Sequence, residues 1–272
     1  MSTSNNPTDK KYKDWEELKE ANPWKEIFDP KEEEKVLLQR VLNEEEFIYS
    51  KDVEIIDDFN KKVQPKGIDN VFVTSLLPKP YRGNLKDPKL VILSLNPSYK
   101  ERVKKTMFKM LKPECQLRFI ELAKKNALLE DDCCIISDDV DVVTDNGYWL
   151  DKLSGLISEQ GVDASKIGLI QFIPYASEHF DSNSWPKNAE LETQKFSVEI
   201  IRRLLYKDKS TLFLVMRAKK RWEELFRKYK IEIDKDENIR QRFLYNNHPI
   251  CQKISPDNLK EQYKEIVKAF NK

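Results

Sequence analysis

Side chains able to do chemistry lie at the ends of three apolar runs of this sequence. Asn96 follows the run at 89–95, Gln171 lies near the end of the run at 166–174, and His248 comes after a short run at 242–245. The amides of Asn96 and Gln171 both donate and accept hydrogen bonds, and a histidine exchanges a proton near neutral pH. Such groups can hold a water molecule or bind the polar edge of a ligand. The same segments hold further aromatic and small polar residues: Ser98, Tyr99, Phe172, Tyr175, Ser177, Ser255 and Asn258.

Buried strands of a parallel sheet must position these residues. Nearly continuous aliphatic runs lie at 89–95, 166–174 and 211–217, and residues 242–245 are a candidate last strand. Such runs, when they alternate with helical stretches of ten or more residues, predict βαβ units. The carboxyl ends of parallel strands share one edge of the sheet, where ligands bind in folds of this kind. We therefore expect the candidate residues to meet at that edge.

Helices are predicted from hydrophobic spacing and from capping residues. Before the sheet, the spacing predicts three short helices within 15–21, 30–47 and 52–62. The segment KPYRGN at 79–84 is expected to break the chain. Ser255 is expected to cap a terminal helix that reaches about residue 270, with Pro256 in its first turn. Further helices are expected over residues 101–126, 149–159, 189–206 and 218–229.

The predicted fold class is α/β, a three-layer α/β/α arrangement around a short, mostly parallel central sheet, preceded by an N-terminal helical extension. We divide the 272 residues into a polar, disordered tail at 1–12, a helical extension at 13–65 and an α/β domain at 66–272. The 48 basic and 47 acidic residues leave a net charge of +1. A nucleic-acid surface would therefore need its positive charge gathered on one face, and a basic run that includes Arg217 and Lys219 is the candidate.

Composition excludes several classes of protein. The four cysteines form no CxxC pair and only two histidines accompany them, so no zinc site is expected. No apolar run approaches the roughly 18 residues of a membrane span, and we expect a soluble, cytoplasmic protein without membrane contact. The sequence lacks GxGxxG, Walker A and HExxH motifs. Its six glycines are few for a glycine-rich loop that binds phosphate. No cofactor is expected.

Three motifs, in this order along the chain, resemble those of the uracil-DNA glycosylase superfamily. The resemblance is closest to its mismatch-specific and single-strand-selective branches and covers roughly residues 70–270. LVILSLNPSY follows YRGN at 81–84 and resembles the first motif, a strand followed by G-[IM]-N-P-G. Ser94 and Ser98 replace both glycines of that pattern. IQFIPYAS resembles the middle motif, with Gln171 where those branches usually carry a base-reading asparagine. The third motif, H-P-S-P-x-N, is split between 248–249 and 255–258.

The resemblance implies a monofunctional DNA glycosylase that hydrolyses the N-glycosidic bond of uracil or another modified base. Its partner would be single- or double-stranded DNA, and the base would first leave the stack. Asn96 would hold the attacking water, and His248 would donate to the leaving base or to a phosphate. The residues expected to bind the base are Gln171, Tyr99, Phe172 and Tyr175. The residues expected to contact DNA are Ser98, Ser177, Ser255, Asn258, Arg217 and Lys219.

Other interpretations stay open. Asn96-Pro97 is also a common start of a turn, Gln171 also suits a polar position in a sheet, and Ser255 also serves as a helix cap. The fold could have lost catalysis and act as a nucleic-acid or nucleotide binding module, which the neutral net charge and the missing glycines favour. A third alternative is an enzyme for a small nucleotide or nucleoside. Protein partners and the role of the N-terminal extension are not predicted.

Overall fold

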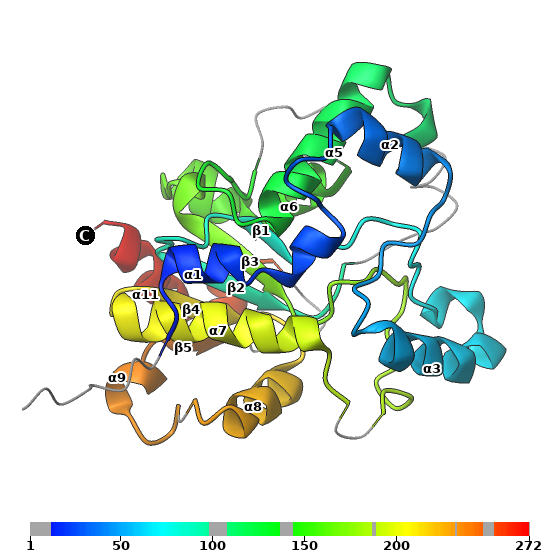
Figure 1. The fold of residues 1–272 in the computed structure, drawn as a ribbon. Coiled ribbons are helices and arrows are strands. Elements are labelled where there is room, and N and C mark those ends of the chain that lie inside the picture. The colour runs from blue at the N-terminus through cyan, green and yellow to red at the C-terminus, as the bar shows by residue number, and fades with distance from the viewer. Residues whose placement is uncertain are drawn as a thin grey trace, which may run out of the picture.

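The centre of the molecule is a five-stranded sheet with the strand order β1-β3-β2-β4-β5 (Figure 1). The computed structural model describes residues 12–97, 108–136, 144–186, 189–231, 233–246 and 253–271. The strands are β1 (Tyr81–Gly83), β2 (Leu90–Ser94), β3 (Ile167–Gln171), β4 (Leu212–Val215) and β5 (Phe243–Tyr245). All neighbouring pairs are parallel except that β1 runs antiparallel to β3 at one edge. The predicted α/β class with a mostly parallel sheet is confirmed.

Helices cover both faces of this sheet. They are α1 (Trp15–Glu20), α2 (Glu34–Leu42), α3 (Val53–Val63), α5 (Pro113–Ala127), α6 (Thr144–Ser154), α7 (Glu192–Lys207), α8 (Lys219–Lys228), α9 (Glu237–Arg240), α10 (Pro256–Leu259) and α11 (Glu261–Phe270). A π-helical turn at Gly155–Glu159 continues α6. Short 3-10 turns lie at Pro23–Glu26, Gln64–Lys66, Ile68–Asn70 and Ala164–Lys166. The predicted helices at 52–62, 189–206 and 218–229 are confirmed by α3, α7 and α8.

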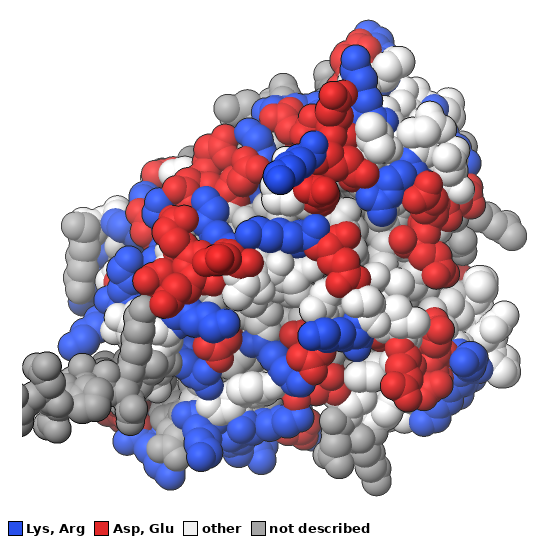
Figure 2. Space-filling model, viewed as in Figure 1, with Lys and Arg blue, Asp and Glu red and all other residues white. Residues whose placement is uncertain are grey.

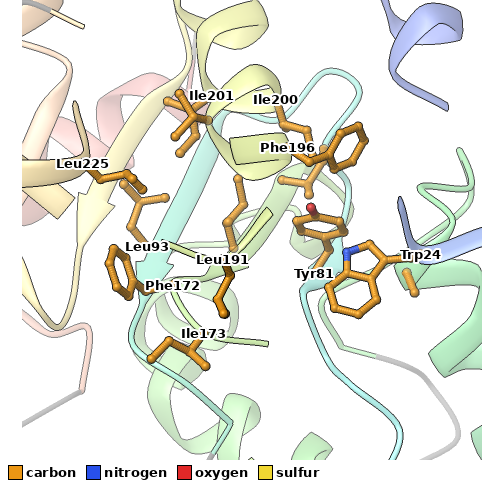
Figure 3. Packing of buried hydrophobic residues seen from close by; sticks show 14 of the residues in the cluster. Trp24, Tyr81, Leu93, Phe172, Ile173, Leu191, Phe196, Ile200, Ile201 and Leu225 are labelled. Carbon is orange, nitrogen blue, oxygen red and sulfur yellow. The ribbon is translucent and has the colours of Figure 1, made fainter. Parts of the chain in front are cut away.

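Two hydrophobic clusters, one on each face of the sheet, give the molecule its three layers. Because side chains alternate along a strand, neighbours such as Leu93 and Ile92 on β2 point into different clusters. The first cluster joins the sheet to α1, α7 and α8, and Figure 3 shows Leu93 packed there beside Ile201 of α7 and Leu225 of α8. The second cluster joins the sheet to α6, α10 and α11. The predicted α/β/α arrangement is therefore confirmed.

The N-terminal extension shares the first cluster. Trp15, Leu18 and Trp24 are buried among the same residues that pack α7 on the sheet. Figure 3 shows Trp24 next to Tyr81 of β1. Figure 1 shows α1 lying alongside α7. Residues 13–65 thus contribute to the core that also holds the α/β layers.

Three elements differ from the sequence predictions. The expected chain break at 79–84 contains the edge strand β1, in which Tyr81 pairs with Ile170 of β3. Three residues are too few to show a hydrophobic period. Helix α2 ends at Leu42, where the left-handed Glu44 (φ 57°) turns the chain, so Phe47 reaches the core from a loop. The terminal helix is interrupted by Lys260, whose φ of 53° no α-helix accommodates.

Gly83 and Gly168 explain how β1 approaches β3 so closely. They face each other in the antiparallel register. A Cβ on Gly168 would lie 2.3 Å from the carbonyl oxygen of Asn84, and Gly83 has a φ of 73° that favours glycine. A side chain at either position would push the edge strand away from the sheet.

Candidate functional site

The order of the strands reverses at β2. From β2 the chain passes to β3 on one side, and it then returns across β2 to β4 on the other side. In open α/β sheets ligands bind beyond the carboxyl ends of the strands at such a reversal. We therefore expect a ligand site at the segments that follow β2, β3 and β4. They contain most of the residues singled out from the sequence.

Asn96, just beyond β2, has its side-chain amide fixed in one orientation. Its Nδ2 donates to the Pro97 carbonyl oxygen at 3.2 Å and to Ser177 Oγ at 3.0 Å. The Pro97 carbonyl can only accept, so the atom facing it must be the NH2 group. Among the described residues no donor reaches the other end of the amide, Oδ1. Asn96 thus presents a fixed hydrogen-bond acceptor at the edge of the sheet.

The loops after β2 and β3 are joined, as the sequence predicted. Ile173 N donates to the Leu95 carbonyl oxygen at 2.7 Å, and Ser177 N donates to the Pro97 carbonyl oxygen at 3.3 Å. Ser177 is only 1% exposed, and its hydroxyl accepts the hydrogen bond from Asn96. The buried hydroxyl of Ser177 therefore positions Asn96, and its predicted contact with DNA stays a prediction.

Gln171 ends β3 beside Ser94 of β2, with which it is paired in register. Strand alternation places its side chain on the same face of the sheet as Ile167 and Leu169. Gln171 is 7% exposed, and its buried Oε1 finds no hydrogen-bond partner among the described residues. An unsatisfied buried acceptor costs roughly 1–3 kcal/mol. It is a group that a ligand N–H or a water would satisfy, two residues along the chain from the joined loops.

The structure does not support Phe172 and Tyr175 as base-stacking residues. Phe172 is 6% exposed and lies inside the first cluster (Figure 3). It packs edge-on against Trp222, with ring centroids 5.1 Å apart. Tyr175 is 1% exposed, and its hydroxyl donates to Asp52 Oδ2 at 3.0 Å. Phe172 is the first residue after β3, and because side chains alternate along the chain it points to the face opposite Gln171. That signal was present in the sequence.

Three of the predicted residues lie outside the described part of the chain. They are Ser98, Tyr99 and His248. Their roles stay predictions.

The ends of β4 and β5 bring together a lysine and an aromatic ring. Lys219 begins α8 after Ala218, which caps the helix in a left-handed conformation (φ 60°). The exposed Lys219 Nζ lies 4.2 Å from the centre of the Tyr245 ring and 3.7 Å from Glu223. Arg217, partly exposed, precedes this turn. Sequence analysis did not single out Tyr245, although it ends a predicted strand next to a predicted DNA-binding loop.

The segment before the terminal helices is largely structural. Ser255 stands at the N-cap of α10 with Pro256 behind it, as predicted, but its side chain makes no capping hydrogen bond to the described residues. Asn258 is 9% exposed and donates to the Lys253 carbonyl oxygen at 2.7 Å. Asn258 therefore stabilises this turn, and its predicted contact with DNA stays a prediction. Ser255 is partly exposed and stays a predicted contact.

Positive charge is concentrated near α8. Residues 217–230 carry seven basic and two acidic side chains, a net charge of +5 in a chain whose total is +1. Figure 2 shows basic side chains gathered on the surface over α8. This segment starts at the carboxyl edge of the sheet, beside the end of β2. The charge distribution is the one that a neutral protein needs for contact with phosphates.

No protein-family model, curated protein or solved structure matches this chain. The class of the protein is therefore defined by its fold and its site. It is an α/β protein with a mostly parallel sheet and a polar site at the carboxyl ends of its strands. Among the described helices, none combines the length and the apolar character that crossing a membrane requires.

Proposed function

We propose that this protein is a DNA glycosylase that hydrolyses the N-glycosidic bond of uracil or another modified base. The observation that carries the proposal is the fixed amide of Asn96, whose nitrogen is held by Pro97 and Ser177 and whose Oδ1 no described donor reaches. The resemblance of the strand-end motifs to the uracil-DNA glycosylase superfamily supports the same assignment. In that comparison the asparagine of the first motif holds the water.

Asn96 Oδ1 accepts a hydrogen bond from a water molecule. This hydrogen bond directs the oxygen of the water toward C1′ of the sugar. The water oxygen bonds to C1′ as the C1′–N bond breaks, and the bonding electrons leave with the base. One water proton passes to solvent or to the departing base. Because this transition state is oxocarbenium-like, positioning of the water matters more than the basicity of the group that holds it. An amide therefore suffices where acyl transfer would need a stronger base.

Gln171 reads the extruded base in this mechanism. Its unpartnered Oε1 accepts a hydrogen bond from an N–H on the edge of the base, which removes the cost of burying that oxygen. Glutamine reaches one methylene further than the asparagine usual in the related branches. This extra length favours a base other than plain uracil.

The test is base release from oligonucleotides, single- and double-stranded, that carry uracil, hypoxanthine, 5-hydroxymethyluracil or glucosylated hydroxymethylcytosine. Hot alkali then reveals abasic sites. We expect cleavage of at least one substrate and a rate about 10²-fold lower for Asn96→Ala, the loss typical of a removed positioning group. Asn43→Ala, at the far end of α2, is the control and should retain activity. Full activity in Asn96→Ala would overturn the mechanism.

A second candidate function is a nucleic-acid binding module without catalysis. The net charge of +5 over residues 217–230 favours DNA as a partner whether or not base release occurs. DNA affinity that falls steeply with salt, with no base release from any substrate, would favour this candidate. An enzyme for small nucleotides would show no such salt-dependent DNA binding.

A further inference from the structure

A cavity of about 440 Å³ lies between the last turns of α7 and α8 and the start of α9. Its volume falls within the roughly 300–1,000 Å³ typical of ligand pockets. The chain passes from the end of α7 directly into the start of β4. The cavity therefore lies toward the amino ends of the strands, at the opposite end of the sheet from Asn96. It belongs to no part of the site described above.

Three cations and one carboxylate line this cavity. The cations are Arg202, Lys230 and Lys235, and the carboxylate is Asp236. Asp236 also caps α9, where its side chain accepts from Asn238 N at 2.9 Å, and Arg202 forms an ion pair with Glu199 one turn earlier on α7. The lining thus carries an excess of positive charge. A phosphate is the common biological group that such a lining attracts.

Two tyrosines provide ring surfaces beside these cations. Tyr229 is fixed from two sides: Arg202 Nη2 donates to its carbonyl oxygen at 2.8 Å, and its hydroxyl is hydrogen-bonded to Glu190. Burial and that hydrogen bond raise the pKa of Tyr229 above its usual value, so the ring stays neutral. Tyr206 also lines the cavity, and its ring stacks on Tyr12 with ring centroids 6.5 Å apart. Aromatic rings next to cations are the pattern that binds a base together with its phosphate.

We propose that this cavity binds a nucleoside phosphate, either free or as one nucleotide of a single strand. The base lies against Tyr206 and Tyr229, and the phosphate is held by Arg202, Lys230 and Lys235. The ten residues of α8 span about 15 Å between the carboxyl edge of the sheet and this cavity. Its basic side chains offer a strand a path from one to the other. The inference stands on the cavity and does not depend on glycosylase activity.

Calorimetric titration of the full chain with AMP, UMP and pyrophosphate tests the cavity. Lys230→Glu reverses a charge on its rim, whereas Lys260→Glu is the matched control. Both lysines are exposed, and both have left-handed backbones, with φ of 55° and 53°. We expect nucleotides to bind the wild type and Lys260→Glu equally, and Lys230→Glu about tenfold more weakly at low salt. No nucleotide binding, equal losses in both variants, or equal affinity for pyrophosphate and nucleotide would overturn the proposal.

A photo-crosslinking experiment identifies the source of the nucleotide. An oligonucleotide of ten nucleotides that carries 4-thiothymidine is irradiated with the protein. The amino-acid residue that becomes crosslinked is then identified by mass spectrometry. Crosslinks at Tyr206 or Tyr229 that AMP suppresses support a bound strand, whereas tight AMP binding without crosslinks supports a free nucleotide. Crosslinks confined to the carboxyl edge, without AMP binding, overturn the proposal. Nucleotide binding and base release are measured in separate assays, so failure of the cavity and failure of the glycosylase are distinguishable.

Discussion

At the scale of single residues, the position of one amide carries the proposed chemistry. Asn96 needs its nitrogen engaged so that its oxygen faces the water, and Ser177 supplies one of the two acceptors that achieve this. Both residues stand in loops, yet those loops continue the β2–β3 hydrogen bonding past the strand ends. A group held in this way loses little freedom when substrate binds. Its orientation should matter more to the rate than to substrate affinity.

Replacing Ser177 tests that reasoning directly. Ser177→Ala removes an acceptor from Asn96 Nδ2, and we expect kcat for base release to fall about tenfold while KM changes little. Ser177→Thr retains a hydroxyl and should recover part of the rate. Ser197→Ala is the control, since Ser197 is also buried but hydrogen-bonds Tyr81 within the core. Equal effects of the two alanine variants would assign Ser177 a merely structural role.

At the scale of elements, α7 is capped at both ends by side chains from distant parts of the chain. At its start, Asp52 accepts from Glu192 N at 2.8 Å and from Thr193 Oγ1 at 2.6 Å. At its end, Arg242 donates to the carbonyl oxygens of Leu204 and Leu205. A carboxylate at the N-terminus and a guanidinium at the C-terminus both complement the helix dipole. The helix that covers the sheet is thus fixed by long-range contacts.

Arg242 should be among the most sensitive positions in the protein. Burial lowers the pKa of its guanidinium to about 10, so it stays charged at neutral pH and donates to four carbonyl oxygens. Arg242→Met leaves these acceptors buried without a donor, and we expect a loss of about 3 kcal/mol or more in the free energy of unfolding. Arg240→Met, two residues away and paired only with Glu237 among the described residues, should change it little. Urea denaturation measures both, and similar values would contradict the capping role.

Asp52 should give the stability a recognisable pH dependence. Burial raises the pKa of its carboxyl above 3.8, and the hydrogen bonds from Thr193 and Tyr175 offset this only in part. Since the folded state then binds the proton more tightly, Asp52 favours folding most below pH 3.8 and loses that contribution as the pH rises through its folded pKa. As the pH rises from 3.8 through the folded pKa of Asp52, the free energy of unfolding of the wild type should therefore fall relative to that of Asp52→Asn. Parallel stability curves for the two proteins would refute the assignment.

At the scale of the whole molecule, residues 13–65 and the α/β layers form one core. Trp24 is fully buried and its ring lies 6.2 Å from that of Tyr175, which follows β3. Trp24→Ala should therefore cost about 3–5 kcal/mol, the usual range for a buried large aromatic residue. Met110→Ala, at an exposed position, should cost little. We expect circular dichroism and tryptophan fluorescence to report one shared urea transition, and two separate transitions would make the extension an independent domain.

The sequence predicted the parts of the fold that have a local signal. The aliphatic runs at 89–95, 166–174 and 211–217 became β2, β3 and β4, because strands buried on both faces must be apolar throughout. The meeting of Asn96 with Ser177 followed from the shared edge of parallel strands. The pairing of Lys219 with Tyr245 had no such signal, since it depends on the neighbouring positions of β4 and β5.

The burial of Tyr175 was also not predictable from its neighbours. Its hydroxyl is satisfied by Asp52, which lies on a separate segment far along the chain. A tyrosine in a polar strand-end loop looks the same in sequence whether it faces a ligand or a buried carboxylate. Only the three-dimensional arrangement decides between the two.

The placement of the N-terminal tryptophans has a consequence for synthesis on the ribosome. Trp15, Leu18 and Trp24 are translated long before the α7 residues that cover them. Until then these apolar side chains have no native partners and are exposed to aggregation or to chaperones. The helices before the sheet should therefore reach their native packing only after α7 has been synthesised.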